Sequence, residues 1–187
     1  MASSNGDQSK LMSNQSGKGL FLAQILIRSV TSLLALAATL VMVKSGQSTT
    51  VFGIVFQAKY SYSSAFRFFV GTNIAVCAFS VISVIAICAF YSPKSNSISN
   101  FSLFLYDLIA MIFSMAGCAA ATSIGYVGKY GQEQIGWTKI CDDVTKFCNL
   151  VMLSIAFSYL AFICLFALVI IAFRHAHSLS TNLLNKD

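Results

Sequence analysis

Charged residues are scarce in this 187-residue chain and make up only 10% of it, whereas an ordinary soluble domain has about 25%. Apolar residues account for 57% of the chain, and the mean hydropathy is +0.76. So little polar surface cannot cover a water-soluble globule. The composition therefore indicates one integral membrane domain, and the length leaves no room for a separate soluble domain.

Proline is almost absent as well, and the single one, Pro93, lies between two apolar runs rather than within one. An uninterrupted helix satisfies all of its backbone groups internally, as the hydrocarbon core of a bilayer demands. The runs that reach the roughly 20 residues needed to cross this core are 20–43, 68–90, 101–125 and 147–173. The strict two-residue alternation of a membrane barrel is missing. We therefore predict an all-α fold, an integral membrane antiparallel four-helix transmembrane bundle.

The segments outside these runs are polar. Residues 1–19 are rich in Ser, Asn, Gln and Gly, and we expect them to form a disordered cytosolic N-terminus. Residues 174–187 are expected to form a short cytosolic tail. The first run has no cleavage site after it, so we expect it to remain as a span. In the first long loop, residues 44–67, the stretch TTVFGIVF is β-branched and aromatic, which predicts a short strand or hairpin at the membrane surface.

Four spans place both termini on one side of the membrane, but charge does not say which side. Lysines and arginines divide almost evenly between the two sides, so the positive-inside rule does not decide the orientation. The acidic loop residues and the loop cysteines all lie on the side opposite the termini, namely Glu133, Asp142, Asp143, Cys141 and Cys148. An oxidising space suits such cysteines, which favours cytosolic termini.

The chain also lacks the motifs of catalysis and of cofactor binding. It has no nucleophile–base pair, no phosphate-binding loop and no set of metal ligands, so we expect neither an enzyme, nor a cofactor, nor a metal site. The net charge of +6 is spread over the loops without a basic cluster. We therefore expect the membrane lipid, and not a nucleic acid, to be the partner that this charge meets.

Two lone charges stand inside the apolar runs. Arg28 lies about 12 Å into the first run and Asp107 about 9 Å into the third, at 1.5 Å per helical residue. These two spans run in the same direction, so the depths agree. An isolated charge in a bilayer costs about 2.5–3.5 kcal/mol on insertion scales. We interpret Arg28 and Asp107 as an ion pair that fastens the first span beside the third. A proton or ion relay is the alternative, but the second and fourth runs contain no charged residue or histidine in their interiors.

Small residues recur at helical intervals in two of the runs, and such faces allow helices to approach closely in lipid. The third run has Ala110, Ser114, Gly117 and Ala121, and the second has Gly71, Ala75 and Ala78. We interpret both faces as packing within the bundle. The alternative is that they pack between protomers.

The second long loop contains two further candidate features. Cys141 and Cys148 flank the sequence DDVTKF, and we favour a disulfide between them. A continuous helix would separate their α-carbons by about 10 Å, beyond the 7 Å that a disulfide can bridge. The bridge therefore requires the chain to turn before the fourth span. Trp137, the only tryptophan, lies in the same loop and is the candidate for recognising a partner.

These features together resemble the plant Casparian strip membrane protein-like (CASP-like) family, a branch of the four-span MARVEL-like proteins. Arg28 and Asp107 match the arginine and aspartate that this family has in its first and third spans. Residues 65–80 (AFRFFVGTNIAVCAFS) resemble the end of its first loop and the start of its second span. The most specific match is the second loop, residues 126–148 (YVGKYGQEQIGWTKICDDVTKFC), which includes Trp137, Cys141 and Cys148.

The resemblance implies a plasma-membrane protein with both ends cytosolic that forms homo-oligomers, and hetero-oligomers with related family members. Strip-forming members build a membrane platform that recruits wall-modifying enzymes. The first loop of this chain departs from theirs because it contains no acidic residue. The hypothesis is a non-enzymatic scaffold that organises a membrane domain facing the cell wall. The alternative is a channel or transporter subunit that uses the buried Arg–Asp pair.

Overall fold

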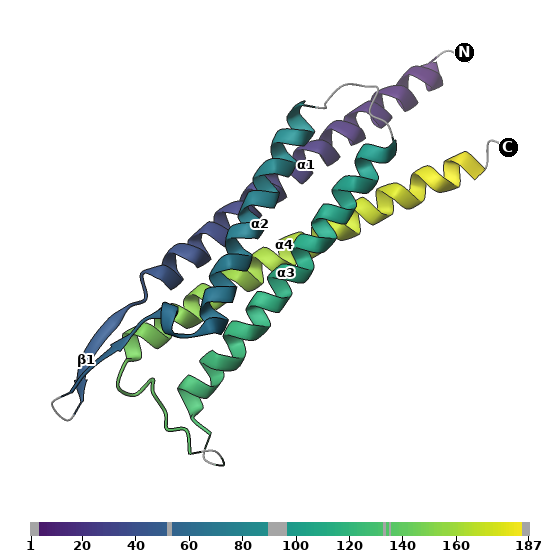
Figure 1. Ribbon diagram of the computed structural model, residues 1–187. Coiled ribbons are helices and arrows are strands. Elements are labelled where there is room, and N and C mark those ends of the chain that lie inside the picture. Colours follow the sequence, from purple (N-terminus) through teal and green to yellow (C-terminus); the bar gives the residue numbers. More distant parts are fainter. Residues whose placement is uncertain (1–3, 52–53, 90–96, 133, 135, 185–187) are drawn as a thin grey trace.

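Four long antiparallel helices form the body of the molecule in the part of the chain that is described (Figure 1). The computed structural model describes residues 4–51, 54–89, 97–132, 134 and 136–184. The helices are α1 (Ser4–Val43), α2 (Ser64–Ala89), α3 (Ser97–Tyr130) and α4 (Thr145–Leu184). The start of α1 and the end of α4 lie at one end of the bundle, and the loops 44–63 and 131–144 lie at the other (Figure 1).

Each helix contains a stretch that is long and apolar enough to cross a bilayer. The four stretches are Phe21–Val43, Ser64–Cys88, Ser102–Tyr130 and Thr145–Arg174. The shortest has 23 residues, which corresponds to about 35 Å of helix and exceeds the roughly 30 Å hydrocarbon core. The prediction of an all-α four-span membrane bundle is confirmed.

The helices extend further than the apolar runs. Helix α1 begins at Ser4, so the structure differs from the expectation that residues 1–19 are disordered. Helix α4 likewise continues beyond the predicted span to Leu184. Nucleation is the costly step of helix formation and propagation is cheap, so a membrane-stabilised span can extend into a polar flank that contains no proline. Pro93, which lies between the second and third apolar runs, falls in residues 90–96, which lie outside the described residues.

The first loop contains the β-hairpin that its composition suggested. Strand β1 (Gln47–Val51) pairs antiparallel with β2 (Ile54–Ala58), and a short 3₁₀ helix, η1 (Tyr60–Tyr62), leads into α2. The side-chain Oε1 of Gln47 accepts a hydrogen bond of 2.9 Å from the backbone N–H of Phe147. This N–H belongs to the first turn of α4, where backbone donors have no partner within the helix. The hairpin is therefore fastened to the helix that follows the second loop.

The helices surround the core as the corners of a square. Helix α1 packs along α2 and α4, and α3 packs along the same two neighbours. Helices α1 and α3 thus face each other across the diagonal of the bundle. Among the residues that the structure describes, the core has two clusters of buried apolar side chains. The cluster near the loops contains Ala38, Met42, Phe66, Phe69, Cys118, Ala121, Val151 and Ile155, and the cluster near the chain ends contains Ala35, Val76, Ala110, Leu165 and Leu168.

Polar and apolar side chains are distributed in the reverse of the water-soluble pattern. The interior includes Arg28, Asn73 and Asp107, together with several serines and threonines. Large aliphatic side chains such as Leu33 and Ile85 instead point outward and are more than half exposed. A continuous apolar exterior of this kind is rare on soluble monomers, and acyl chains solvate it well. The arrangement fits a protein whose solvent is lipid.

Candidate functional site

The ion pair at the centre of the bundle has the geometry of a bidentate clamp. Nη1 of Arg28 donates to Oδ1 of Asp107, and Nη2 donates to Oδ2, both over 2.6 Å. The two side chains are only 5% and 4% exposed. Paired charge-assisted hydrogen bonds of this kind are about twice as strong as neutral ones and fix the orientation of both groups. The Nε of Arg28 is also buried and has no hydrogen-bond partner among the described residues.

The pair joins helices that do not lie side by side. We expected it to fasten the first span beside the third, but α1 and α3 stand on the diagonal, with α2 and α4 between them. The long arginine side chain spans this diagonal. The contact therefore crosses the centre of the bundle. It fixes the distance between two opposite helices, which a bond between adjacent helices would not do.

A second polar layer links three helices by hydrogen bonds. The Oγ of Ser158 on α4 donates to the Oδ1 of Asn73 on α2 over 2.9 Å, and the Sγ of Cys118 on α3 donates to Ser158 over 3.2 Å. The Nδ2 of Asn73 donates to the backbone oxygen of Phe69 over 2.9 Å, so both ends of the amide are engaged. This layer adds polar contacts to the packing that holds the bundle in lipid.

Ser154 makes the corresponding link to α1, where its Oγ donates to the backbone oxygen of Ala38 over 2.7 Å. Neither Ser154 nor Ser158 was predicted from the sequence. Their signal was the four-residue spacing of two hydroxyls on one face of an otherwise apolar run.

Within the described ranges, no group of three or more His, Cys, Asp or Glu side chains could hold a metal ion.

The two small-residue faces point in different directions, one into the bundle and one outward. On α3, the set Ala110, Ser114, Gly117 and Ala121 points into the bundle. Gly117 lets α3 lie close against α2, because a Cβ there would lie 3.1 Å from the Cβ of Thr72 and collide with its hydroxyl. This face packs within the bundle, as expected.

On α2, the structure differs from that interpretation. Gly71 and Ala78 are exposed, Ala75 is half-buried, and nothing lies within 4 Å of a Cβ built at Gly71. The inward face of α2 is occupied instead by residues such as Thr72 and Val76. Small residues at helical spacing show that one face of a helix has no bulky side chains. They do not show whether that face packs against another helix of the bundle or against lipid.

The second loop is a compact structure held by two turns and a disulfide. Gly131 and Gly136 have φ values of 70° and 73°, which favour glycine. Gln132 and Trp137, which directly follow these two glycines, exchange backbone hydrogen bonds of 2.8 and 3.0 Å. Trp137 itself is 54% exposed, so its indole is available to a partner.

The structure joins Cys141 to Cys148 by a disulfide, with a Cα–Cα distance of 5.7 Å. The chain turns directly after Cys141, where the N–H groups of Asp143 and Val144 both donate to the backbone oxygen of Ile140. Helix α4 begins only at Thr145. The turn that a bridge required is therefore present.

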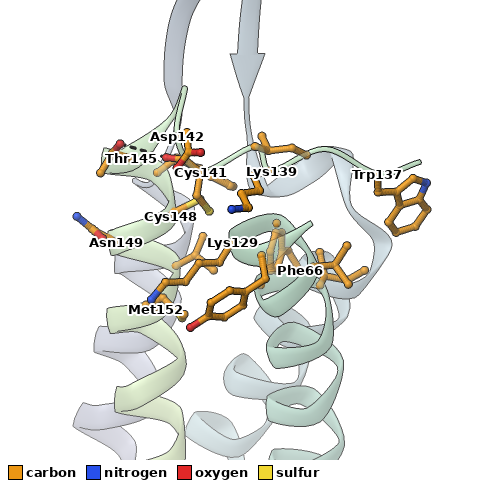
Figure 2. A pocket seen from close by; sticks show the side chains of 18 residues that line it. Phe66, Lys129, Trp137, Lys139, Cys141, Asp142, Thr145, Cys148, Asn149 and Met152 are labelled. Atoms are coloured by element: carbon orange, nitrogen blue, oxygen red, sulfur yellow. Dashed lines mark hydrogen bonds between the residues drawn. A yellow bond between two sulfur atoms is a disulfide. The ribbon is translucent and has the colours of Figure 1, made fainter. Parts of the chain in front are cut away.

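A cavity of about 480 Å³ lies beneath this loop, between the end of α3 and the start of α4 (Figure 2). Apolar side chains, including Phe66 and Val151, form much of its wall, and the disulfide forms another part. Lys129, Lys139 and Asp142 supply the charged groups of its lining. Sequence reasoning did not find this cavity, because its residues come from three segments that only the fold brings together.

Comparison with known proteins gives these features a context. The family model described as the Casparian strip membrane protein domain matches residues 17–164. A protein named CASP-like protein 1F2 from Ricinus communis is 48% identical over 86% of this chain and 79% of its own length. Its namesake from Vitis vinifera is 45% identical over 84% of this chain and 82% of its own length. CASP-like protein 1F1 from Ricinus communis is 48% identical over 79% of this chain and 83% of its own length.

No solved structure matches this chain. The matched region contains Arg28, Asp107 and the disulfide-closed loop, and it leaves out the start of α1 before residue 17 and the second half of α4 after residue 164. The family model and the shared identity with plant relatives agree with the resemblance that the second loop indicated. This multi-pass membrane protein belongs to the CASP-like family of plants.

Proposed function

We propose that the protein is a non-enzymatic scaffold of the plasma membrane that self-associates and holds its hairpin and second loop toward the cell wall. Both termini are cytosolic in this proposal. The main observation in favour of self-association is the outward face of α2, where Gly71, Ala75 and Ala78 have little or no side chain. Small residues on a lipid-facing helix surface let a second backbone approach closely, which favours helix association.

The rigidity of the bundle supports the same proposal. The ion pair joins α1 to α3 across the diagonal, hydrogen bonds link α2 to α4 and α4 to α1, and Gln47 fastens the hairpin to α4. A protomer tied together in this way presents its outer surface and its loops in a fixed relation. Repetition of such a unit would give an ordered array, with related family members able to join it through the same face.

The loops are the part of the scaffold that would meet other proteins. Trp137 is more than half exposed, and aromatic residues of this kind often anchor protein interfaces. We propose that the loop surface recruits wall-modifying enzymes to the membrane domain. The acid-free first loop gives this chain a surface chemistry that differs from that of the strip-forming members, and we therefore assign no role in the Casparian strip itself.

Subunit counting in lipid nanodiscs or native membrane vesicles tests the self-association. The wild-type protein should form dimers or larger assemblies, whereas Gly71→Ile combined with Ala78→Ile should shift the population toward monomers. Ala156→Ile is the matched control, because Ala156 is an exposed alanine on another helix, α4. A wild-type protein that is strictly monomeric and fails to pull down related family members would remove the proposal.

A channel or transporter subunit is the second candidate, because the Arg28–Asp107 pair occupies the bundle centre, where a permeation path would run. Arg28 and Asp107 bind each other there, and Asn73 is bonded to Ser158 and to the backbone. Conductance across a bilayer that disappears in Asp107→Asn would favour the channel over the scaffold.

A further inference from the structure

The cavity beneath the second loop lies where the hydrocarbon of the bilayer gives way to headgroups. Apart from Phe66 in the first turn of α2, its helical lining comes from the last turns of α3 and the first turns of α4. These turns are the ends of the membrane-spanning stretches Ser102–Tyr130 and Thr145–Arg174. Spans of this length exceed the hydrocarbon core, so their ends reach the headgroup level. The cavity is therefore accessible to lipid rather than only to water.

Two glycines leave part of the α3 side of the cavity without side chains. Gly125 and Gly128 lie on the face of α3 that lines it. A Cβ at Gly125 would lie 3.7 Å from the Cδ1 of Ile155, and one at Gly128 would lie 3.9 Å from the Sγ of Cys141. The space beside these glycines is bordered by apolar side chains such as Val151 and Met152. Its volume of about 480 Å³ is within the range of about 300–1,000 Å³ typical of small-molecule sites.

Among the described residues, the lining has more positive than negative side chains. Lys129 and Lys139 both contribute to it, and Asp142 is the one carboxylate among the described lining residues. The Lys139 ammonium points into the cavity, below the loop (Figure 2). In the part of the chain that the structure describes, neither lysine forms an ion pair, because the one salt bridge there joins Arg28 to Asp107. The Nζ of Lys129 lies 5.5 Å from the centre of the Tyr130 ring.

We infer that this cavity binds a lipid of the adjacent leaflet whose phosphodiester headgroup has a net negative charge. The phosphate lies between Lys129 and Lys139, and the first part of an acyl chain occupies the space beside Gly125 and Gly128. The remainder of the chains stays in the bilayer. Two ammonium groups without a carboxylate partner, together with an apolar wall, match the two ends of such a lipid, whereas a soluble anion would leave the apolar wall unused. The inference needs only the membrane-spanning fold and does not depend on the scaffold role.

Titration of the full-length protein with phosphatidylglycerol and with phosphatidylcholine tests this site. Bound lipid is counted by native mass spectrometry, and the thermal unfolding midpoint is measured in the same detergent. We expect phosphatidylglycerol to bind more tightly and to raise the midpoint more. Each basic residue near an anionic surface contributes about 1 kcal/mol, which is about a fivefold change in affinity. Lys139→Gln and Lys129→Gln should therefore each weaken binding about fivefold.

Lys146→Gln is the matched control, because Lys146 is an exposed lysine near the start of α4 that does not line the cavity. It should leave the affinity unchanged. Gly128→Leu fills the cavity without changing charge and should also reduce phosphatidylglycerol binding. The lysine variants remain informative if this larger change disturbs folding, because both lysines are exposed.

Three results would each overturn the inference. One is equal binding of the two lipids. Another is an equal loss in Lys146→Gln and Lys139→Gln, which would indicate charge attraction without a site. The last is full reproduction of the midpoint shift by inorganic phosphate, which would show that the lysines bind a soluble anion and the apolar wall contributes nothing.

Discussion

Truncation of Asp107 to alanine is the most direct test of how this bundle is held together. The change removes a carboxylate that accepts two hydrogen bonds of 2.6 Å from Arg28. The guanidinium would remain at the bundle centre, where its Nε already has no partner in the described structure. All of its donors would then lack a carboxylate, in a place where lipid and apolar side chains offer no replacement.

The magnitude follows from these bonds. A hydrogen bond to a charged group contributes about 1.5–3 kcal/mol, so the loss of two corresponds to about 3–6 kcal/mol. Removal of one member of a buried ion pair typically costs about 3–5 kcal/mol, which is in the same range. We expect Asp107→Ala to lower the free energy of unfolding by about 4 kcal/mol and to reduce accumulation of the protein at the cell surface.

The double variant Arg28→Leu with Asp107→Leu is the control for this reasoning. Replacement of a buried ion pair by apolar residues is often neutral or stabilising, because the cost of burying two charges disappears with them. We therefore expect the double variant to be more stable than either single variant. The two singles and the double together form a cycle that isolates the coupling between the residues.

Unfolding in mixed micelles, followed by circular dichroism, measures the stability, and a fluorescent fusion in plant cells reports surface accumulation. Single variants that match the wild type in both assays would refute the account of the pair as a central clamp. A double variant less stable than both singles would refute it as well.

Three further changes probe other contacts. Gly117→Ala should destabilise the bundle by about 1–3 kcal/mol through overpacking, whereas Gly71→Ala should leave the stability of the monomer unchanged; equal unfolding curves for the two would contradict the assigned packing. Cys148→Ser should lower the thermal midpoint, because opening a loop of this length costs about 2.5 kcal/mol in the chain-entropy model; a wild-type protein that is insensitive to reductant would argue against this. Gln47→Ala should cost about 0.5–1.5 kcal/mol and speed amide exchange at Phe147, and unchanged exchange there would show that the hairpin does not cap α4.

Much of the site could be predicted because its signals are local. A charge in an apolar run is visible without any fold, and equal depth in two parallel spans made Asp107 the partner of Arg28. The disulfide was also predictable, subject to the condition that the chain turns after Cys141. The two serines of α4 could not be assigned partners, because a hydroxyl in a helix can bond its own backbone, another helix or nothing.

The four spans, their approximate ends and the depth of the two buried charges follow from the amino-acid sequence alone, because a bilayer imposes length and apolarity on each helix separately. The diagonal placement of α1 and α3, the inward Gly117 face and outward Gly71 face, and the cavity below the second loop arise from the packing of the helices in three dimensions. The reason is that lipid is as apolar as a protein core. An inward leucine and an outward leucine therefore look alike in the sequence, and the choice between them is made by the packing of the helices against one another.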